Sequence, residues 1–295
     1  MKEKIIGRRR FLRYAAAVTA GTGLLGKTGS AKSSQKGAKL RKALQLGMLP
    51  KELPDTEKFK LAKKCGFDGI EAYPMDDLDA ARQLGRLARQ AGVPIHSIVY
   101  GGWDAPFSDP DPKVIDKGLA RMETALRSAK VLGADTVLLV PAVVKEDVSY
   151  DQAYKRSQTH IKKLLPLAKE LGVIIAVENV WNKFLLSPLE FARYVDEFES
   201  PWLKAYFDIG NVILFGYSQD WIRTLGKRIV KIHLKDFKRR GYEWTNLLDG
   251  DVNWPEVRRA LDEIGYDGFL TTELHGGDEP YLTDLAGRID RFFAM

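Results

Sequence analysis

The sequence predicts a single-domain α/β fold, a (β/α)₈ TIM barrel. Short apolar runs alternate with periodic helical segments through residues 43–295, which indicates parallel strands joined by right-handed crossovers. Helical segments end on glycine just before the next run, as in CGFDGIEAY, LGADTVLLV and IGYDGFLTTE. Four runs in the second half end on a carboxylate or a histidine, and such charges are tolerated where barrel strands leave the core.

Eight apolar runs are the predicted strands. They cover Leu44–Leu49, Gly69–Tyr73, Ile95–Val99, Thr136–Val140, Ile174–Glu178, Lys204–Asp208, Val230–Leu234 and Phe269–Glu273. The helical segments between them include Lys113–Leu132, Tyr154–Leu171 and Pro188–Phe198. Eight units without a second core favour a closed barrel over an open sheet. No G-x-G-x-x-G or P-loop motif opens a helix, which argues against a nucleotide-binding fold.

Positive charge is concentrated near the N-terminus. The formal net charge is +7, to which residues 1–31 contribute +6 and residues 32–42 contribute +5, leaving −4 for residues 43–295. The predicted barrel is therefore mildly acidic. An acidic domain does not suit a surface that follows a phosphate backbone, so we expect no nucleic-acid partner.

The N-terminus resembles a twin-arginine signal peptide. The motif RRRFLR at residues 8–13 precedes a weakly apolar stretch, and small residues suited to cleavage follow at residues 29–31. The apolar stretch is too short and too rich in glycine and alanine to span a membrane stably. We expect residues 1–31 to be the signal, 32–42 a basic linker and 43–295 the barrel. The expected location is the periplasm or another exported compartment, with the twin-arginine export machinery as a partner.

Four predicted strands end on side chains that bind metals, namely Glu178, Asp208, His233 and Glu273. The carboxyl ends of barrel strands converge at one mouth, so these groups are expected to share one divalent cation. Three carboxylates and one imidazole suit Mn²⁺, Mg²⁺, Co²⁺ or Zn²⁺, with Mn²⁺ as the first expectation.

The same four residues predict a proton-transfer reaction. Four protein ligands leave an octahedral cation two positions for the adjacent carbonyl and hydroxyl oxygens of a sugar. The cation would stabilise the enediolate formed when the neighbouring carbon loses its proton. Glu178 and Glu273, the two longer carboxylates, are the predicted acid–base pair.

Further residues near the strand ends are expected to contact the substrate. They are Glu71, His96, Trp181, Asn182, Asn211 and Lys235. A buried structural role is the alternative for His96, and ligand orientation or a structural ion pair is the alternative for Glu71. Asp236 is expected to contact the metal ligands without binding the metal itself. The basic run at residues 238–240 is expected to be solvated.

Several blocks of the sequence resemble the sugar phosphate isomerase/epimerase family. They are AVENVWNKF, YFDIGNV, KIHLKDF, LLDGDVNWPEV and GYDGFLTTELH. The resemblance implies the xylose isomerase-like barrel of ketose 3-epimerases and hydroxypyruvate isomerases. It also implies one metal on Glu178, Asp208, His233 and Glu273, with proton exchange by the two glutamates. Asn211 stands where free-ketose epimerases often carry histidine, as in the branch that resembles phosphopentulose 3-epimerases.

The predicted activity is metal-dependent epimerisation or isomerisation of a ketose or keto-sugar. Because phosphorylated sugars are mostly cytoplasmic, export favours an unphosphorylated or glycosidic substrate. The alternatives are β-elimination from 3-keto-glycosides at the same site, an AP-endonuclease-type DNA repair enzyme, and a non-catalytic sugar-binding barrel. A trinuclear, histidine-rich repair site fits poorly with four histidines in the chain. The expected small-molecule partner is a sugar, and self-association into a homo-oligomer is left open.

Overall fold

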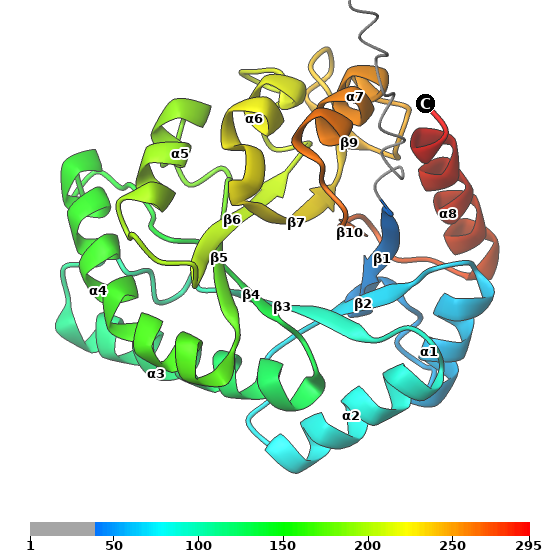
Figure 1. Ribbon diagram of the computed structural model, residues 1–295, viewed down its shortest axis with the longest axis horizontal. Helices are drawn as coiled ribbons and strands as arrows, with labels where there is room; N and C mark the ends of the chain where they lie inside the picture. The colour runs from blue at the N-terminus through cyan, green and yellow to red at the C-terminus, as the bar shows by residue number, and fades with distance from the viewer. Residues whose placement is uncertain (1–38) are drawn as a thin grey trace, which may run out of the picture. The chain divides into compact units, whose positions relative to one another are not determined.

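The computed structural model describes residues 39–295, which form a closed barrel of eight parallel strands (Figure 1). The strands are β1 Arg41–Gln45, β2 Gly69–Ala72, β3 Ile95–Gly101, β4 Thr136–Leu139, β5 Ile174–Glu178, β6 Leu203–Asp208, β7 Ile229–Leu234 and β10 Phe269–Thr272. Their order around the barrel is β1-β10-β7-β6-β5-β4-β3-β2, so the first and last strands close it. The predicted (β/α)₈ TIM barrel is confirmed.

Within residues 39–295, α-helices α1 to α8 surround the strands (Figure 1). They are α1 Asp55–Lys64, α2 Leu78–Gln90, α3 Pro112–Leu132, α4 Tyr150–Leu171, α5 Pro188–Asp196, α6 Ser218–Leu225, α7 Trp254–Ile264 and α8 Glu279–Phe293. Helix α4 begins four residues before its predicted start because Ser149 and Gln152 form a reciprocal cap. Gly172 ends the same helix with a φ of 66°, a conformation that glycine adopts without strain.

The register of the strands places the ends of neighbouring strands at one level. Asp208 of β6 pairs with His233 of β7. Glu178 of β5 pairs with Tyr206, two residues before Asp208. Directly after β10, the backbone N–H of Glu273 donates to the carbonyl of Leu234. Four consecutive strands of the barrel therefore deliver their last side chains to the same mouth.

The first strand differs from its prediction. We expected it at Leu44–Leu49, but β1 ends at Gln45 and Leu46–Met48 form the 3-10 helix η1. Arg41 and Lys42, which we assigned to the linker, belong to β1 and pair with β10. The long side chain of Lys42 carries its charge out of the barrel, since its Nζ lies 2.8 Å from Asp290 Oδ1. The guanidinium of Arg41 instead lies over the ring of Phe269, 3.9 Å from its centroid.

A short antiparallel hairpin after β7 was missed in the sequence. Strands β8 Asp236–Lys238 and β9 Glu243–Thr245 form this two-stranded sheet. The basic run at residues 238–240 was predicted to be solvated, and Arg239 and Arg240 are indeed exposed, although Arg239 also makes specific contacts. Its guanidinium donates to the carbonyls of Ile213 and Gly216 and so fastens the hairpin to the loop after β6.

The expected signal peptide at residues 1–31 lies outside the described residues, as does the linker up to residue 38. Within residues 39–295, no helix has the length and apolar character needed to cross a membrane.

Candidate metal centre

Four side chains converge where the strands reach the barrel mouth. They are Glu178 at the end of β5, Asp208 at the end of β6, His233 in β7 and Glu273 just beyond β10. Each offers one ligand atom, and these four atoms all lie within 4.8 Å of one another. The structure therefore brings together the residues that the sequence assigned to one cation.

The imidazole of His233 is oriented by contacts on both sides. Its Nδ1 lies 2.8 Å from Glu178 Oε1, 2.9 Å from Glu273 Oε2 and 3.9 Å from Asp208 Oδ2. Its Nε2 lies 2.7 Å from Glu71 Oε2. Donation from Nε2 to Glu71 leaves the Nδ1 lone pair facing the three carboxylates. Metal-binding histidines typically use their second nitrogen in this way.

Two carboxylate oxygens of the cluster lack the partners that burial demands. Asp208 Oδ2 and Glu273 Oε2 are buried and accept no hydrogen bond of good geometry within residues 39–295. Lys235 Nζ lies 3.2 Å and 2.7 Å from these atoms and provides a partial countercharge. Buried carboxylates are costly unless they are paired or bind a metal. The donor set and its two unsatisfied oxygens fit a divalent cation.

The pKa values of Glu178 and Glu273 are shifted in opposite directions. Burial raises the pKa of Glu178 to about 7. Burial by itself would raise the pKa of Glu273 too, but the charges of His233 and Lys235 outweigh it and lower that pKa to about 2. Paired carboxyl groups with separated pKa values are typical of acid–base sites.

Glu71 contacts His233 and is enclosed by other protein side chains. Besides the imidazole, its carboxylate accepts hydrogen bonds from Ser97 Oγ at 2.8 Å, Tyr206 Oη at 2.6 Å and Gln45 Nε2 at 3.2 Å. With these contacts the side chain is fully buried. These contacts match the alternative of ligand orientation.

Aromatic side chains form the walls of a cavity of about 370 Å³ beside the cluster. They are Tyr73, Tyr100, Trp103, Trp181 and Trp244. Lys235 and Asn211 also line this cavity, together with Glu178, His233 and Glu273. Trp181 stacks on Trp244 of the β8–β9 hairpin with ring centroids 5.0 Å apart. Trp181, Lys235 and Asn211, which were predicted to contact the substrate, thus line the cavity at the metal-ligand cluster.

Two asparagines, Asn179 after β5 and Asn211 after β6, form hydrogen bonds that fix the backbone and the carboxylate of Asp208. Asn211 donates its backbone N–H to Asp208 Oδ1 at 2.7 Å, which turns Oδ2 toward the other ligands. Asn179 was missed in the sequence, although a polar residue directly after Glu178 was a signal for it. Its side chain accepts from the N–H of Asp208 and donates to the carbonyl of the same residue, both at 2.9 Å. A Cβ at Gly210 would lie 2.6 Å from Lys235 Cβ, so glycine permits this loop to approach the site.

Two predicted site residues instead stabilise loops. Asn182, which was predicted to contact the substrate, donates to the carbonyl of Ala142 at 2.7 Å and accepts from the N–H of Phe184. Asp236 accepts hydrogen bonds from Trp254 Nε1 and from three backbone N–H groups, those of Phe237, Gly250 and Val252. Its carboxylate therefore organises the segment before α7 and does not support the metal ligands.

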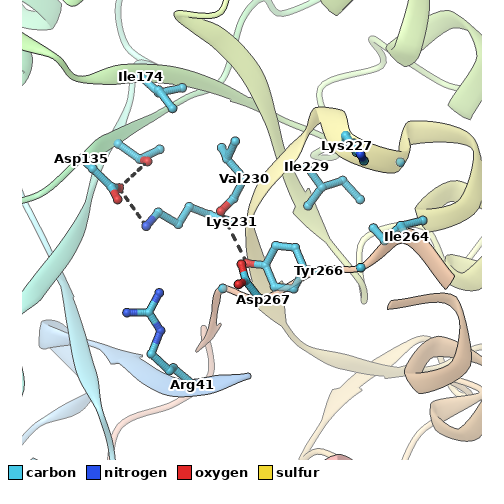
Figure 2. Close-up of a pocket in the computed structure, with 14 residues that line it drawn as sticks. Arg41, Asp135, Ile174, Lys227, Ile229, Val230, Lys231, Ile264, Tyr266 and Asp267 are labelled. Atoms are coloured by element: carbon cyan, nitrogen blue, oxygen red, sulfur yellow. Dashed lines mark hydrogen bonds and ion pairs between the residues drawn. The ribbon is translucent and has the colours of Figure 1, made fainter. Parts of the chain in front are cut away.

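A separate charged cavity of about 410 Å³ lies at the opposite end of the barrel (Figure 2). Arg41, Ile174 and Ile229, which line it, are the first residues of their strands. Figure 2 shows Lys231 extended toward Asp135, with Nζ 2.8 Å from Oδ1. The amino-terminal end of such barrels typically serves stability, and this cavity contains none of the metal ligands.

His96 lies toward this amino-terminal end, since it is the second residue of β3. Its ring stacks on Phe269 at 4.0 Å, and its Nε2 lies 3.1 Å from Thr271 Oγ1. These contacts match the alternative of a buried structural role, because His96 stands near the start of the strand and not at its end. Burial, followed by the charges of Lys231 and Arg41, lowers the pKa of His96 well below its usual value.

Comparisons with known proteins agree with this fold. The family model described as xylose isomerase-like TIM barrel matches residues 59–290. SgbU of Haemophilus influenzae, provisionally named an L-ribulose-5-phosphate 3-epimerase, is 30% identical over 260 residues, covering 81% of this chain and 91% of SgbU. L-ribulose-5-phosphate 3-epimerase UlaE of Escherichia coli O1:K1 is 25% identical over 251 residues, covering 80% of this chain and 88% of UlaE.

A solved structure shows the same fold at lower identity. The 3-keto-D-glucoside 4-epimerase YcjR of Escherichia coli superimposes with a TM-score of 0.73 at 16% identity, covering 87% of this chain and all of YcjR. The relatives named here are sugar epimerases, and epimerases are isomerases, which agrees with the predicted enzyme class.

Replacing Glu71 by Gln should weaken Mn²⁺ binding about 10- to 100-fold, because the imidazole of His233 loses a charged partner. Competition titration against a chelating dye measures the affinity, and circular dichroism verifies the fold. Glu170→Gln, on the exposed face of α4, is the matched control. Unchanged Mn²⁺ affinity in the Glu71 variant would contradict the orienting role.

His96 should make stability depend on pH. Its folded pKa is depressed, so below about pH 6.5 the unfolded chain binds a proton that the folded chain does not. The free energy of unfolding should therefore fall with decreasing pH by up to about 1.4 kcal/mol per pH unit. We expect the free energy of unfolding, measured with urea at several pH values from 5 to 7, to change less with pH in His96→Gln than in wild type. His275→Gln is the control, and an identical slope in wild type and His96→Gln would refute the assignment.

Proposed function

The chain belongs to the xylose isomerase-like TIM barrel family, and from this premise we propose that it is a divalent-metal-dependent epimerase or isomerase of a ketose or keto-sugar. The observation that carries the proposal is the convergence of Glu178, Asp208, His233 and Glu273 beside an aromatic-lined cavity. A sugar ring suits this cavity, because aromatic walls pack against its C–H groups while the polar cluster meets its oxygens.

We assign the metal site to those four residues, with Mn²⁺ first and Mg²⁺, Co²⁺ or Zn²⁺ as alternatives. The mixture of hard carboxylate oxygens and one imidazole supports this range of ions. A bound cation supplies a Lewis acid that polarises the carbonyl of the sugar. Glu71 keeps His233 in its ligating orientation, and Asn211 keeps Asp208 Oδ2 turned inward.

Glu178 and Glu273 are the proposed proton carriers. They come from β5 and β10, the two ends of the arc of strands β5-β6-β7-β10 that carries the cluster. A carbon held between them presents one face to each carboxylate. One glutamate removes the proton next to the carbonyl, giving an enediolate of the sugar, and the other returns a proton to the opposite face. Return to the same carbon gives an epimer, and return to the neighbouring carbon gives an isomer.

Lys235 is the proposed contact for a substrate oxygen. Its Nζ lies 2.7 Å from Glu273 Oε2 and 5.5 Å from the ring centroid of Trp244. The ammonium group is thus fixed at the edge of the cavity, next to the proposed proton carrier. There it can hydrogen-bond to a sugar oxygen and stabilise negative charge that develops on it.

β-Elimination from a 3-keto-glycoside is the alternative reaction. It begins with the same removal of a proton next to a ketone, and a second cavity adjoins Glu273 where a leaving group would lie. Release of the aglycone would distinguish it from epimerisation. The repair-enzyme alternative has less support, because the metal-ligand cluster found in residues 39–295 contains a single histidine.

Export through the twin-arginine pathway is also part of the proposal. The motif at residues 8–13 supports it, and an exported enzyme suits an unphosphorylated or glycosidic sugar.

Replacing Glu273 by Gln should lower proton exchange at least about 100-fold, because Gln cannot transfer the proton. Glu178→Gln should do the same. Nuclear magnetic resonance can follow deuterium uptake from D₂O into keto-sugars by the Mn²⁺-loaded protein, and metal analysis reports occupancy. Glu170→Gln is the control. Full exchange activity in Glu273→Gln would exclude the proposed role.

Replacing Arg8 and Arg9 together by Lys should stop export, because the paired arginines are the signal that the twin-arginine machinery reads. Fractionation of a bacterial host should then find the full-length chain in the cytoplasm, while Lys36→Arg is exported normally. Equal export of both variants would refute the signal.

A further inference from the structure

Two cavities lie next to each other at the carboxyl end of the barrel. The first, of about 370 Å³, contains the metal-ligand cluster, and the second has a volume of about 570 Å³. They share three lining residues, Lys235, Trp244 and Glu273. Each volume falls in the range that small-molecule ligands occupy, so together they exceed what one sugar ring needs.

The walls of the second cavity suit a sugar. Tyr281 and Trp244 offer aromatic faces, and Thr245, Asn246 and His275 add polar atoms. Within residues 39–295, Tyr281 Oη, Thr245 Oγ1 and Asn246 Nδ2 make no hydrogen bond in the structure, so they are free to bind hydroxyl groups. Aromatic faces next to free hydrogen-bonding groups are what a sugar ring requires.

The second cavity offers little positive charge for a phosphate. Among the residues in 39–295 that line this cavity, the one lysine is Lys235, and there is no arginine. The Nζ of Lys235 already lies 2.7 Å from Glu273 Oε2 and 3.2 Å from Asp208 Oδ2. Arg239 of the hairpin donates to backbone carbonyls instead. His275 is the remaining group able to carry positive charge. A phosphate here would face the carboxylate of Glu273 without a free cation to bind it.

We propose that the substrate is an uncharged glycoside with at least two units. The keto-sugar ring lies beside the metal ligands, and the second unit lies in the cavity between Trp244 and Tyr281. This inference rests on the proposed function and narrows it, because a phosphorylated pentulose would leave the second cavity empty.

The test compares substrates with one and two rings on the Mn²⁺-loaded full-length protein in D₂O. The one-ring probes are the methyl 3-keto-α- and 3-keto-β-D-glucosides, and the two-ring probes are 3-keto-trehalose and 3-keto-cellobiose. L-Ribulose 5-phosphate is the charged probe. We expect kcat/KM for deuterium uptake or aglycone release to be at least about tenfold higher for a two-ring probe than for its one-ring counterpart.

Variants locate the second ring. Tyr281→Ala and Asn246→Ala should each lower the ratio of two-ring to one-ring kcat/KM, by about tenfold for Tyr281. Tyr281→Phe should retain part of that ratio, since the aromatic face remains. Tyr217→Ala is the matched control, because Tyr217 is exposed and lines neither cavity. Thermal unfolding verifies that each variant is folded.

The outcomes separate this inference from the proposed function. Equal kcat/KM for one-ring and two-ring probes, a preference for L-ribulose 5-phosphate, or ratios unchanged in both cavity variants would overturn the second subsite alone. Failure of every probe to exchange or release its aglycone would contradict the proposed function and this inference with it.

Discussion

The compensation of buried negative charge at the barrel mouth is the constraint on which the site depends. Three carboxylates, from Glu178, Asp208 and Glu273, face one imidazole nitrogen of His233. Such crowding is unfavourable without positive charge between the groups. Glu71 orients the imidazole through its Nε2, and the ammonium group of Lys235 supplies a countercharge next to Glu273. A divalent cation would complete this arrangement, and the neighbouring side chains keep the four candidate ligands oriented toward it.

The fold determines which residues can take part. Parallel strands that end at one level place residues far apart in the sequence around one point. The β8–β9 hairpin adds Trp244 to the wall of the site, and Asp236 fixes the segment that returns from it to α7. The chemistry thus comes from strand ends, whereas the shape of the substrate cavity comes from the loops.

The barrel and the four ligands were predictable because each rests on a local pattern. An apolar run that ends on a carboxylate or a histidine marks a strand leaving the core, as at Glu178 and His233. The roles of residues that depend on distant hydrogen-bond partners could not be predicted from the sequence. His96 was expected near a strand end, but it is the second residue of β3 and its ring packs on Phe269. Asn182 and Asp236 looked like site residues, but hydrogen bonds to loop backbone occupy their side chains.

Anomalous X-ray diffraction from crystals of the Mn²⁺-loaded protein tests the central claim most directly. The account predicts one strong manganese peak with Glu178, Asp208, Glu273 and Nδ1 of His233 at coordination distance, about 2.0–2.6 Å. A peak elsewhere, or no peak at the barrel mouth at saturating Mn²⁺, would contradict it.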